Sequence, residues 1–406
     1  MSAMRNMAIL LAAAGLALAA ACDRSPQALQ DGLPAARAPD GAALFARLAR
    51  DPSFFPIGVW LQSPQRLDQY RSIGVNLFVG TNGELTAEDL ERFGNAGVFV
   101  IADRTEGFPL SRAEGVVLGW RVPGEPDNAQ KQADGRWGAC VAPAQLLTQY
   151  RELKALDRRP VFLNFGRGVA QLGWNGRGSC TGNAETYYPD GARGGDIVSF
   201  DIYPVASASG RLELVAEGVR NLVRWSRQSD PRRPVWNYIE AAPILGGAVP
   251  TPAQLRSEVW LSIINGSRGI LYFPWRVSDH GERVREDALF GYPELVAAVR
   301  TINHEVRSLA PVINRGRRLA GLTVTSSTGA PVSAVALQYR RSIYLFAALE
   351  RPVPATVSFA APWLRAKKVV RTAGDAVASG DGGFADSFDG YGVRLYRIDG
   401  IDAARR

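Results

Sequence analysis

The stretch VVLGWRVPGEPDN, residues 116–128, joins an apolar run to an acidic turn. The run VVLGW is typical of a strand that is buried on both faces, as in a parallel sheet. A Pro-Gly pair ends this strand, and Glu125 follows it directly. A second apolar run, PVWNYIEAA at residues 234–242, also ends on a carboxylate, Glu240. The two glutamates at the ends of two predicted strands are therefore candidate catalytic residues.

Strands of this kind recur along the chain and alternate with helical patterns. Apolar runs predict eight strands that begin at or near residues 54, 75, 98, 116, 160, 196, 234 and 269. Capping residues and apolar spacing predict helices over 64–74, 87–95, 143–156, 212–228, 253–265 and 292–309, with a brief turn or helix near 111–114. Eight such units in about 250 residues predict a (β/α)8 barrel over residues 51–313. A doubly wound open sheet is the alternative, but no glycine-rich phosphate-binding sequence follows the first strand.

The pattern changes after residue 313. Residues 314–406 consist of short alternating segments such as VSAVALQYR and SIYLFAALE, separated by turn residues and without helical periodicity. Such segments are typical of an antiparallel β-sandwich. We therefore predict a second, smaller domain behind the barrel.

The N-terminus has the features of an export signal. Residues 1–22 contain one arginine, a short apolar run and small residues before Cys22. They resemble a bacterial lipoprotein signal, in which Cys22 is lipidated after cleavage. We therefore expect a periplasmic or cell-envelope protein, anchored to the membrane at Cys22 and followed by a tether over residues 23–50. Ordinary secretion with cleavage near Ala21 is the alternative.

The composition limits the remaining function classes. The chain has 406 residues, 46% hydrophobic and 21% charged, which is an ordinary globular composition. Its net charge of +8 arises mainly from scattered arginines and suits a solvated surface, because no nucleic-acid-binding motif accompanies it. In an oxidising compartment Cys140 and Cys180 are expected to form a disulfide, with two free thiols as the alternative. With only two histidines, a metal site is not expected.

Polar and aromatic residues stand where the predicted strands end. The carboxyl ends of the strands form the active face of a (β/α)8 barrel. Aromatic rings stack on the apolar faces of sugars, and polar side chains bind sugar hydroxyls. The candidate substrate-binding residues are Trp60, Arg121, Asn164, Asp201, Tyr203, Trp236, Tyr238 and Trp275. The alternatives are core aromatics, an ion pair of Asp201 with Arg121 or Arg276, and a surface turn at Glu125.

These features resemble the retaining glycoside hydrolases of clan A, in which the acid/base glutamate follows strand four and the nucleophile ends strand seven. The resemblance implies that Glu125 is the acid/base and Glu240 the nucleophile. It further implies that Tyr203 hydrogen-bonds the nucleophile and that Trp275 lies under the reacting sugar. Many of these families have Asn where this chain has Gly124, so the match is to the clan and not to one family.

The sequence thus predicts a retaining glycoside hydrolase that acts on an oligo- or polysaccharide through two carboxyl groups and needs no cofactor. In an inverting enzyme the carboxyl groups would instead be about 6.5–9.5 Å apart. The alternative from another class is a non-catalytic carbohydrate-binding lipoprotein with a degenerate hydrolase barrel.

Overall fold

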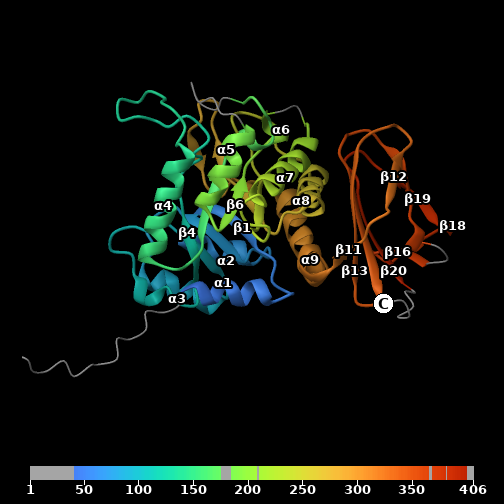
Figure 1. The fold of residues 1–406 in the computed structure, drawn as a ribbon, viewed down its shortest axis with the longest axis horizontal. Helices are drawn as coiled ribbons and strands as arrows, with labels where there is room; N and C mark the ends of the chain where they lie inside the picture. Colours follow the sequence, from blue (N-terminus) through green and yellow to red (C-terminus); the bar gives the residue numbers. More distant parts are fainter. Residues whose placement is uncertain (1–40, 175–183, 208–209, 365–367, 381, 400–406) are drawn as a thin grey trace, which may run out of the picture. The chain divides into compact units, whose positions relative to one another are not determined.

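The computed structural model describes residues 41–174, 184–207, 210–364, 368–380 and 382–399. The first part of the described chain is a closed barrel of eight parallel strands in sequence order (Figure 1). The strands are β1 Ile57–Gln62, β2 Leu77–Thr81, β3 Phe99–Ala102, β4 Val117–Arg121, β5 Val161–Phe165, β6 Ile197–Phe200, β7 Val235–Glu240 and β8 Ile270–Phe273. The predicted (β/α)8 barrel is therefore confirmed.

Helices follow most of these strands. They are α1 Gly41–Arg50, α2 Leu67–Arg71, α3 Ala87–Ala96, α4 Pro143–Leu156, α5 Ala184–Gly191, α6 Pro204–Ser207, α7 Glu213–Ser226, α8 Pro252–Asn265 and α9 Pro293–Arg315. Short 3-10 turns occupy Pro64–Arg66, Leu110–Arg112, Arg167–Val169, Ala192–Gly194, Ala288–Gly291 and Pro362–Leu364. The sequence did not predict α5 or α6, because both are short and lack a clear apolar period.

The helix ends follow from local capping chemistry. Thr86 starts α3 by accepting a hydrogen bond from the Asp89 N–H at 3.1 Å, and the Asp89 carboxylate accepts the Thr86 N–H in return, also at 3.1 Å. Such a reciprocal pair satisfies two backbone donors that the helix leaves unpaired. Thr251 and Gln254 form the same arrangement at α8.

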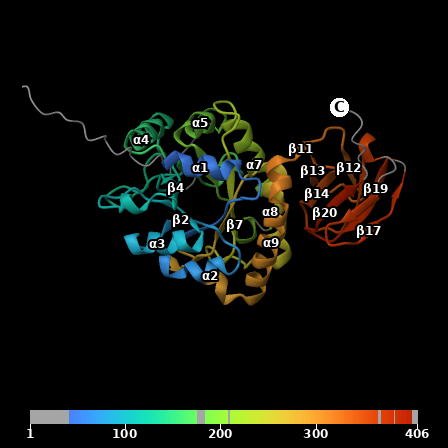
Figure 2. The same cartoon turned by 90° about the horizontal axis from the view of Figure 1, so that it is seen from below.

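Two apolar layers hold the barrel together. Leu77, Ile101 and Leu118 belong to a buried cluster that also contains Leu44 and Leu48 of α1. Helix α1 thus packs against the barrel, and it contacts β4 (Figure 2). The interior is a packed core and not a channel, as is usual for this architecture.

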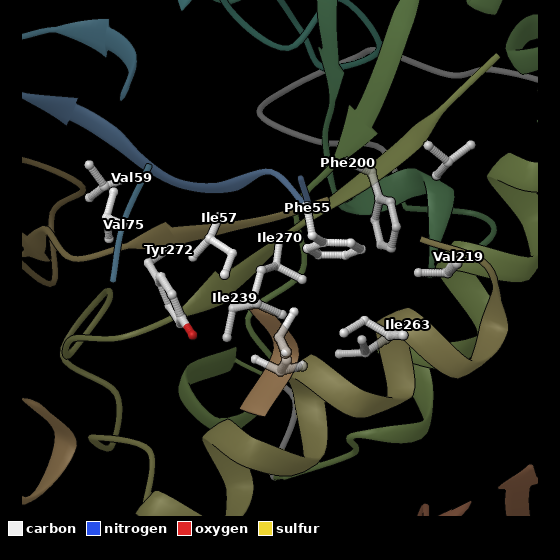
Figure 3. Packing of buried hydrophobic residues seen from close by; sticks show 14 of the residues in the cluster. Phe55, Ile57, Val59, Val75, Phe200, Val219, Ile239, Ile263, Ile270 and Tyr272 are labelled. Carbon is white, nitrogen blue, oxygen red and sulfur yellow. The ribbon is translucent and has the colours of Figure 1, made fainter. Parts of the chain in front are cut away.

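The outer layer lies between the strands and the surrounding helices. Figure 3 shows part of it, where Ile239 of β7 and Ile270 of β8 face Ile263 of α8. Neighbouring residues of one strand point to opposite sides, so Tyr238 belongs to the inner cluster and Ile239 to the outer one. This alternation decides which strand residues can reach the site.

A β-sandwich follows the barrel. Its strands are β11 Arg317–Arg318, β12 Thr323–Ser326, β13 Val332–Tyr339, β14 Ser342–Leu349, β15 Ala355–Ala360, β16 Lys368–Arg371, β17 Ala376–Val377, β18 Ser379–Gly380, β19 Gly383–Phe388 and β20 Val393–Asp399. They pair antiparallel in the orders β11-β13-β14-β20-β16-β17 and β12-β15-β19-β18. The predicted second domain is thus confirmed, and its Phe346 packs on Trp260 of α8 with ring centroids 5.1 Å apart.

Within the described ranges, no helix combines the length and the apolar character needed to cross a membrane. The predicted lipidation site, Cys22, and the disulfide partner Cys180 both lie outside the described residues. The anchor and the Cys140–Cys180 pairing therefore stay predictions.

Candidate active site

A cavity of about 540 Å³ opens where the barrel strands end, and residues from several strand ends line it. Its volume is in the range of sites that bind small ligands. The lining includes six predicted residues besides Glu125: Trp60, Arg121, Asn164, Asp201, Tyr203 and Tyr238. The cavity thus brings together predicted residues as far apart in the chain as Trp60 and Tyr238.

Glu125 stands in a fixed turn at the cavity wall. Gly124 before it has a φ of +82°, a conformation that residues with a Cβ rarely adopt. Glycine meets this backbone requirement at the position where many clan A families have Asn. The side-chain amide of Asn128 donates a hydrogen bond to the Glu125 carboxylate, and the Gln130 amide donates to the Glu125 carbonyl at 3.0 Å.

Gly166, just after β5, leaves room for this turn. A Cβ built at Gly166 would lie 2.5 Å from Asn128 Nδ2 and 3.0 Å from Glu125 Oε2. No side chain can therefore stand there without moving the Glu125 carboxylate or its donor. The Gly166 N–H donates to Asp127 Oδ1 at 2.7 Å, and the Tyr188 hydroxyl donates to Asp127 Oδ2 at 2.8 Å. Asp127 therefore ties the acidic turn to the neighbouring strand.

Asp201, the first residue after β6, is the second carboxyl group in the cavity. Asn164 Nδ2 donates to Asp201 Oδ1 at 2.9 Å, and the Ser199 hydroxyl donates to Asn164 Oδ1 at 2.7 Å. Tyr203 also hydrogen-bonds the Asp201 carboxyl. Burial, and next the negative charge of Glu125, raise the pKa of Asp201 well above its usual range. The two carboxyl groups are close enough for their charges to interact, and Asp201 keeps its proton more readily than an ordinary aspartate.

Aromatic rings form the apolar wall of the cavity. Trp60 stacks on Phe273 with ring centroids 5.0 Å apart, and Tyr203 lies 4.9 Å from the same ring. Trp60 is half-buried, so one part of its indole is held by Phe273 while another part is open. This wall suits the apolar face of a sugar ring.

Arg121 is paired with a carboxylate other than the predicted one. Its Nη2 donates to Asp103 Oδ2 at 2.7 Å, across β4 and the end of β3. The alternative interpretation of Asp201 as an ion-pair partner of Arg121 is therefore wrong. The Asp201 carboxyl group is instead hydrogen-bonded by the neutral side chains of Asn164 and Tyr203.

Glu240 ends β7, as predicted, but it is not among the described residues that line the cavity. Its side chain is fully buried. Oε1 accepts the Val205 N–H at 2.6 Å and Oε2 accepts the Ala206 N–H at 3.0 Å, so both oxygens are bound to α6. The structure thus does not bring Glu240 and Glu125 to one cavity. The described contacts instead give Glu240 the role of fixing the segment that carries Asp201 and Tyr203.

A second buried carboxyl group, Glu258 of α8, lies against Glu240. Burial, and next the negative charge of Glu240, raise the pKa of Glu258 well above its usual range, while burial raises the pKa of Glu240 to about 7. As a carboxylate, Glu258 would have no hydrogen-bond partner for either oxygen in the described part of the chain. As a neutral acid it can donate its proton to Glu240, so we infer that the pair shares one proton.

Two predicted aromatic residues lie in the core and not at the cavity. Trp236 is 1% exposed and packs on Phe162 with ring centroids 5.6 Å apart. Trp275 is 7% exposed and donates its Nε1–H to the Leu61 carbonyl at 3.0 Å. Its ring lies 6.4 Å from Trp60, which places it beside the cavity wall. Neither residue is among those that line the cavity, so their role in substrate binding stays a prediction.

The cavity residues that the sequence interpretation missed include Arg167, Trp174 and Arg283. Arg167 follows the end of β5 by two residues, so its position after a predicted strand could have identified it as a candidate site residue. Trp174 and Arg283 belong to segments beyond the strand ends. Arg283 stands in a hairpin formed by β9 Arg276–Val277 and β10 Arg283–Arg285, which had no sequence signal.

Comparison with known proteins gives a fold and no family. No protein-family model and no curated protein matches the sequence. An α-amylase from Geobacillus thermoleovorans, solved with acarbose, aligns over 87% of this chain and 100% of its own, with 11% identity and a TM-score of 0.54. A noncanonic maltogenic α-amylase, AmyB from Thermotoga neapolitana, aligns over 85% and 98% with 12% identity and a TM-score of 0.49.

A GH30 endoxylanase from Clostridium papyrosolvens C71 aligns over 86% of this chain and 97% of its own, with 11% identity and a TM-score of 0.48. At such low identities the likeness shows the fold alone, and the argument rests on the TM-score of 0.54. The predicted resemblance to barrel hydrolases is confirmed at the level of the barrel with its C-terminal β-domain.

Proposed function

We propose that the protein is a glycoside hydrolase and that Glu125 and Asp201 are its two catalytic carboxyl groups. The observation that carries this proposal is their position in one aromatic-lined cavity at the strand ends, where burial, and next the charge of Glu125, raise the pKa of Asp201. Glycoside hydrolysis requires one carboxylic acid and one carboxylate. A neighbouring pair in which one member holds its proton meets this requirement.

The proposed roles follow from the two environments. Asp201 donates its proton to the glycosidic oxygen as the bond to the anomeric carbon breaks. Glu125, oriented by Asn128, attacks the anomeric carbon to form a glycosyl ester, and water then releases the sugar while Asp201 takes back a proton. This double displacement keeps the retaining mechanism that the sequence resemblance implies, but it replaces Glu240 by Asp201 and exchanges the role of Glu125.

Variants of the three carboxyl residues test the proposal. The purified protein is assayed for reducing ends on plant, bacterial and acidic polysaccharides. Asp201→Asn should lower kcat by about 10²–10⁴-fold, the usual contribution of acid–base catalysis. Glu125→Gln should lower kcat at least as much, because it removes the nucleophile. Glu258→Gln is the matched control, because its amide replaces a buried carboxyl group outside the cavity, can still donate a hydrogen bond to Glu240 and should keep activity.

Three outcomes would count against the proposal. If the Asp201→Asn variant is fully active and the Glu240→Gln variant is inactive, the catalytic pair is Glu125 and Glu240, as predicted from the sequence. Inversion at the anomeric carbon, followed by NMR of the first product, would exclude the double displacement. A protein that binds glycans but never releases reducing ends would instead be a carbohydrate-binding barrel.

We also propose that the protein acts at the cell envelope and is anchored through Cys22. The proposal rests on the sequence of residues 1–22. Mass spectrometry of the N-terminal peptide from membranes tests it. A diacylated Cys22 is expected, whereas an unmodified N-terminus near residue 22 in the soluble fraction would contradict the anchor.

A further inference from the structure

Two arginines of the cavity wall form no ion pair with a carboxylate in the described part of the chain. Arg167 follows β5 and Arg283 opens β10, and both line the cavity. None of the ion pairs between described residues involves either of them, although the third cavity arginine, Arg121, is paired with Asp103. Their two positive charges are therefore not neutralised by carboxylates within the described protein.

Neutral groups hold both side chains in place. Arg167 Nε donates to Gln171 Oε1 at 2.7 Å, and its guanidinium carbon lies 4.6 Å from the centroid of the Trp174 ring. The guanidinium of Arg283 lies 5.6 Å from the Trp60 ring and 5.3 Å from the Trp275 ring. Aromatic and amide contacts orient a guanidinium without cancelling its charge.

The surroundings make an anion favourable at Arg167. Burial, and next the positive charge of Arg211, lower the pKa of Arg167, which means that its charged form is disfavoured where it stands. An anionic ligand would relieve both effects. A guanidinium presents two parallel N–H groups that match the two oxygens of a carboxylate.

We propose that the cavity takes a saccharide that carries a carboxylate, a uronic acid unit, and that Arg167 and Arg283 bind anionic units of the chain. This inference rests on the proposed glycoside hydrolase function and names its substrate class. The uronate carboxylate lies toward the arginines and away from the Glu125 carboxylate, which would repel it. Specificity arises because a neutral sugar leaves the half-buried charge of Arg167 without a carboxylate beside it.

Paired substrates test this inference. Oligosaccharides of galacturonate, mannuronate and glucuronate are each compared with their carboxyl-reduced, neutral forms, for hydrolysis by the wild type and for binding by the Glu125→Gln variant. We expect at least one uronate series to be cleaved, and bound, about tenfold or more better than its reduced form. Arg167→Gln and Arg283→Gln should each raise KM for that uronate about tenfold or more, with little effect on the neutral form.

Arg276→Gln is the matched control, because Arg276 is exposed in the same hairpin as Arg283 but is not a cavity residue. It should leave KM unchanged.

Hydrolysis of neutral sugars as well as or better than uronates would overturn the inference and leave the proposed function intact. Equal binding of sulfated neutral sugars and uronates would overturn the assignment to carboxylate. No cleavage with selective uronate binding would overturn the hydrolase and support the ligand class, whereas neither cleavage nor selective binding would overturn both.

Discussion

The raised pKa of Asp127 predicts a specific pH dependence of stability for the barrel. Asp127 ties the turn of Glu125 to β5 through the Gly166 N–H and the Tyr188 hydroxyl. Burial, opposed by the Gly166 N–H, raises its pKa from 3.8 to about 6. The folded protein thus holds a proton that the unfolded chain loses. The associated stability is present below the unfolded pKa and is lost as the pH rises through the folded one.

The magnitude follows from the size of the shift. A shift of about two pKa units corresponds to about 3 kcal/mol, because each unit is worth about 1.4 kcal/mol. Asp127→Asn removes the titration while keeping an acceptor for the Gly166 N–H. The free energy of unfolding of this variant relative to wild type should therefore rise by about 2–2.5 kcal/mol between pH 4 and pH 7, because the unfolded aspartate is already partly ionised at pH 4.

Urea unfolding at pH 4, 5, 6 and 7 measures this difference. Tryptophan fluorescence is a suitable signal for the barrel, because eight of the nine tryptophans precede residue 314. Groups whose charges do not interact with Asp127 cancel when variant and wild type are compared at each pH. A difference that stays constant within 1 kcal/mol, or that moves in favour of the wild type as the pH rises, would refute the assignment of a raised pKa to Asp127.

Three further perturbations test other parts of the site. Gly166→Ala should lower kcat by about 10²-fold, since its Cβ would lie 2.5 Å from Asn128 Nδ2, and a crystal structure should find the Glu125 carboxylate displaced. Trp60→Ala should raise KM about tenfold in steady-state assays, because the sugar loses a stacking surface worth about 1–1.5 kcal/mol; an unchanged KM would exclude stacking there. Glu240→Gln should lower the free energy of unfolding at pH 8 by about 2–3 kcal/mol in urea titrations. The glutamine amide N–H₂ would face a backbone N–H of α6, so two donors would meet without an acceptor. A variant as stable as the wild type would contradict the contact.

The barrel could be predicted from the sequence because each of its units carries a local signal. Buried parallel strands appear as continuous apolar runs, and the N-capping residues Thr86 and Thr251 mark the starts of α3 and α8. The β-sandwich could be predicted for the same reason, since its alternating apolar and polar segments differ from the continuous apolar runs of the barrel strands. Elements without such signals were missed, such as the short helix α6 and the hairpin that carries Arg283.

The candidate site was predictable only in part, because strand position does not determine where a side chain points. Trp60, Asn164 and Asp201 reach the cavity as predicted. Glu240 does not, because the backbone amides of α6 bind both of its oxygens. No residue pattern predicted that these amides would bind Glu240, since α6 is a helix of only four residues after the end of β6. The same segment brings Asp201 into the cavity with Glu125, whereas the sequence pattern indicated Asp201 as a substrate ligand or an ion-pair partner of an arginine.

The central claim is that Asp201, and not Glu240, works with Glu125. A crystal structure of Glu125→Gln with a bound oligosaccharide tests it most directly. We predict an Asp201 oxygen within about 3 Å of the glycosidic oxygen, the reach of a proton donor. In the same structure the Glu240 carboxyl should still accept the Val205 and Ala206 N–H groups. A Glu240 carboxyl turned toward the anomeric carbon, with Asp201 out of contact with the sugar, would contradict the account.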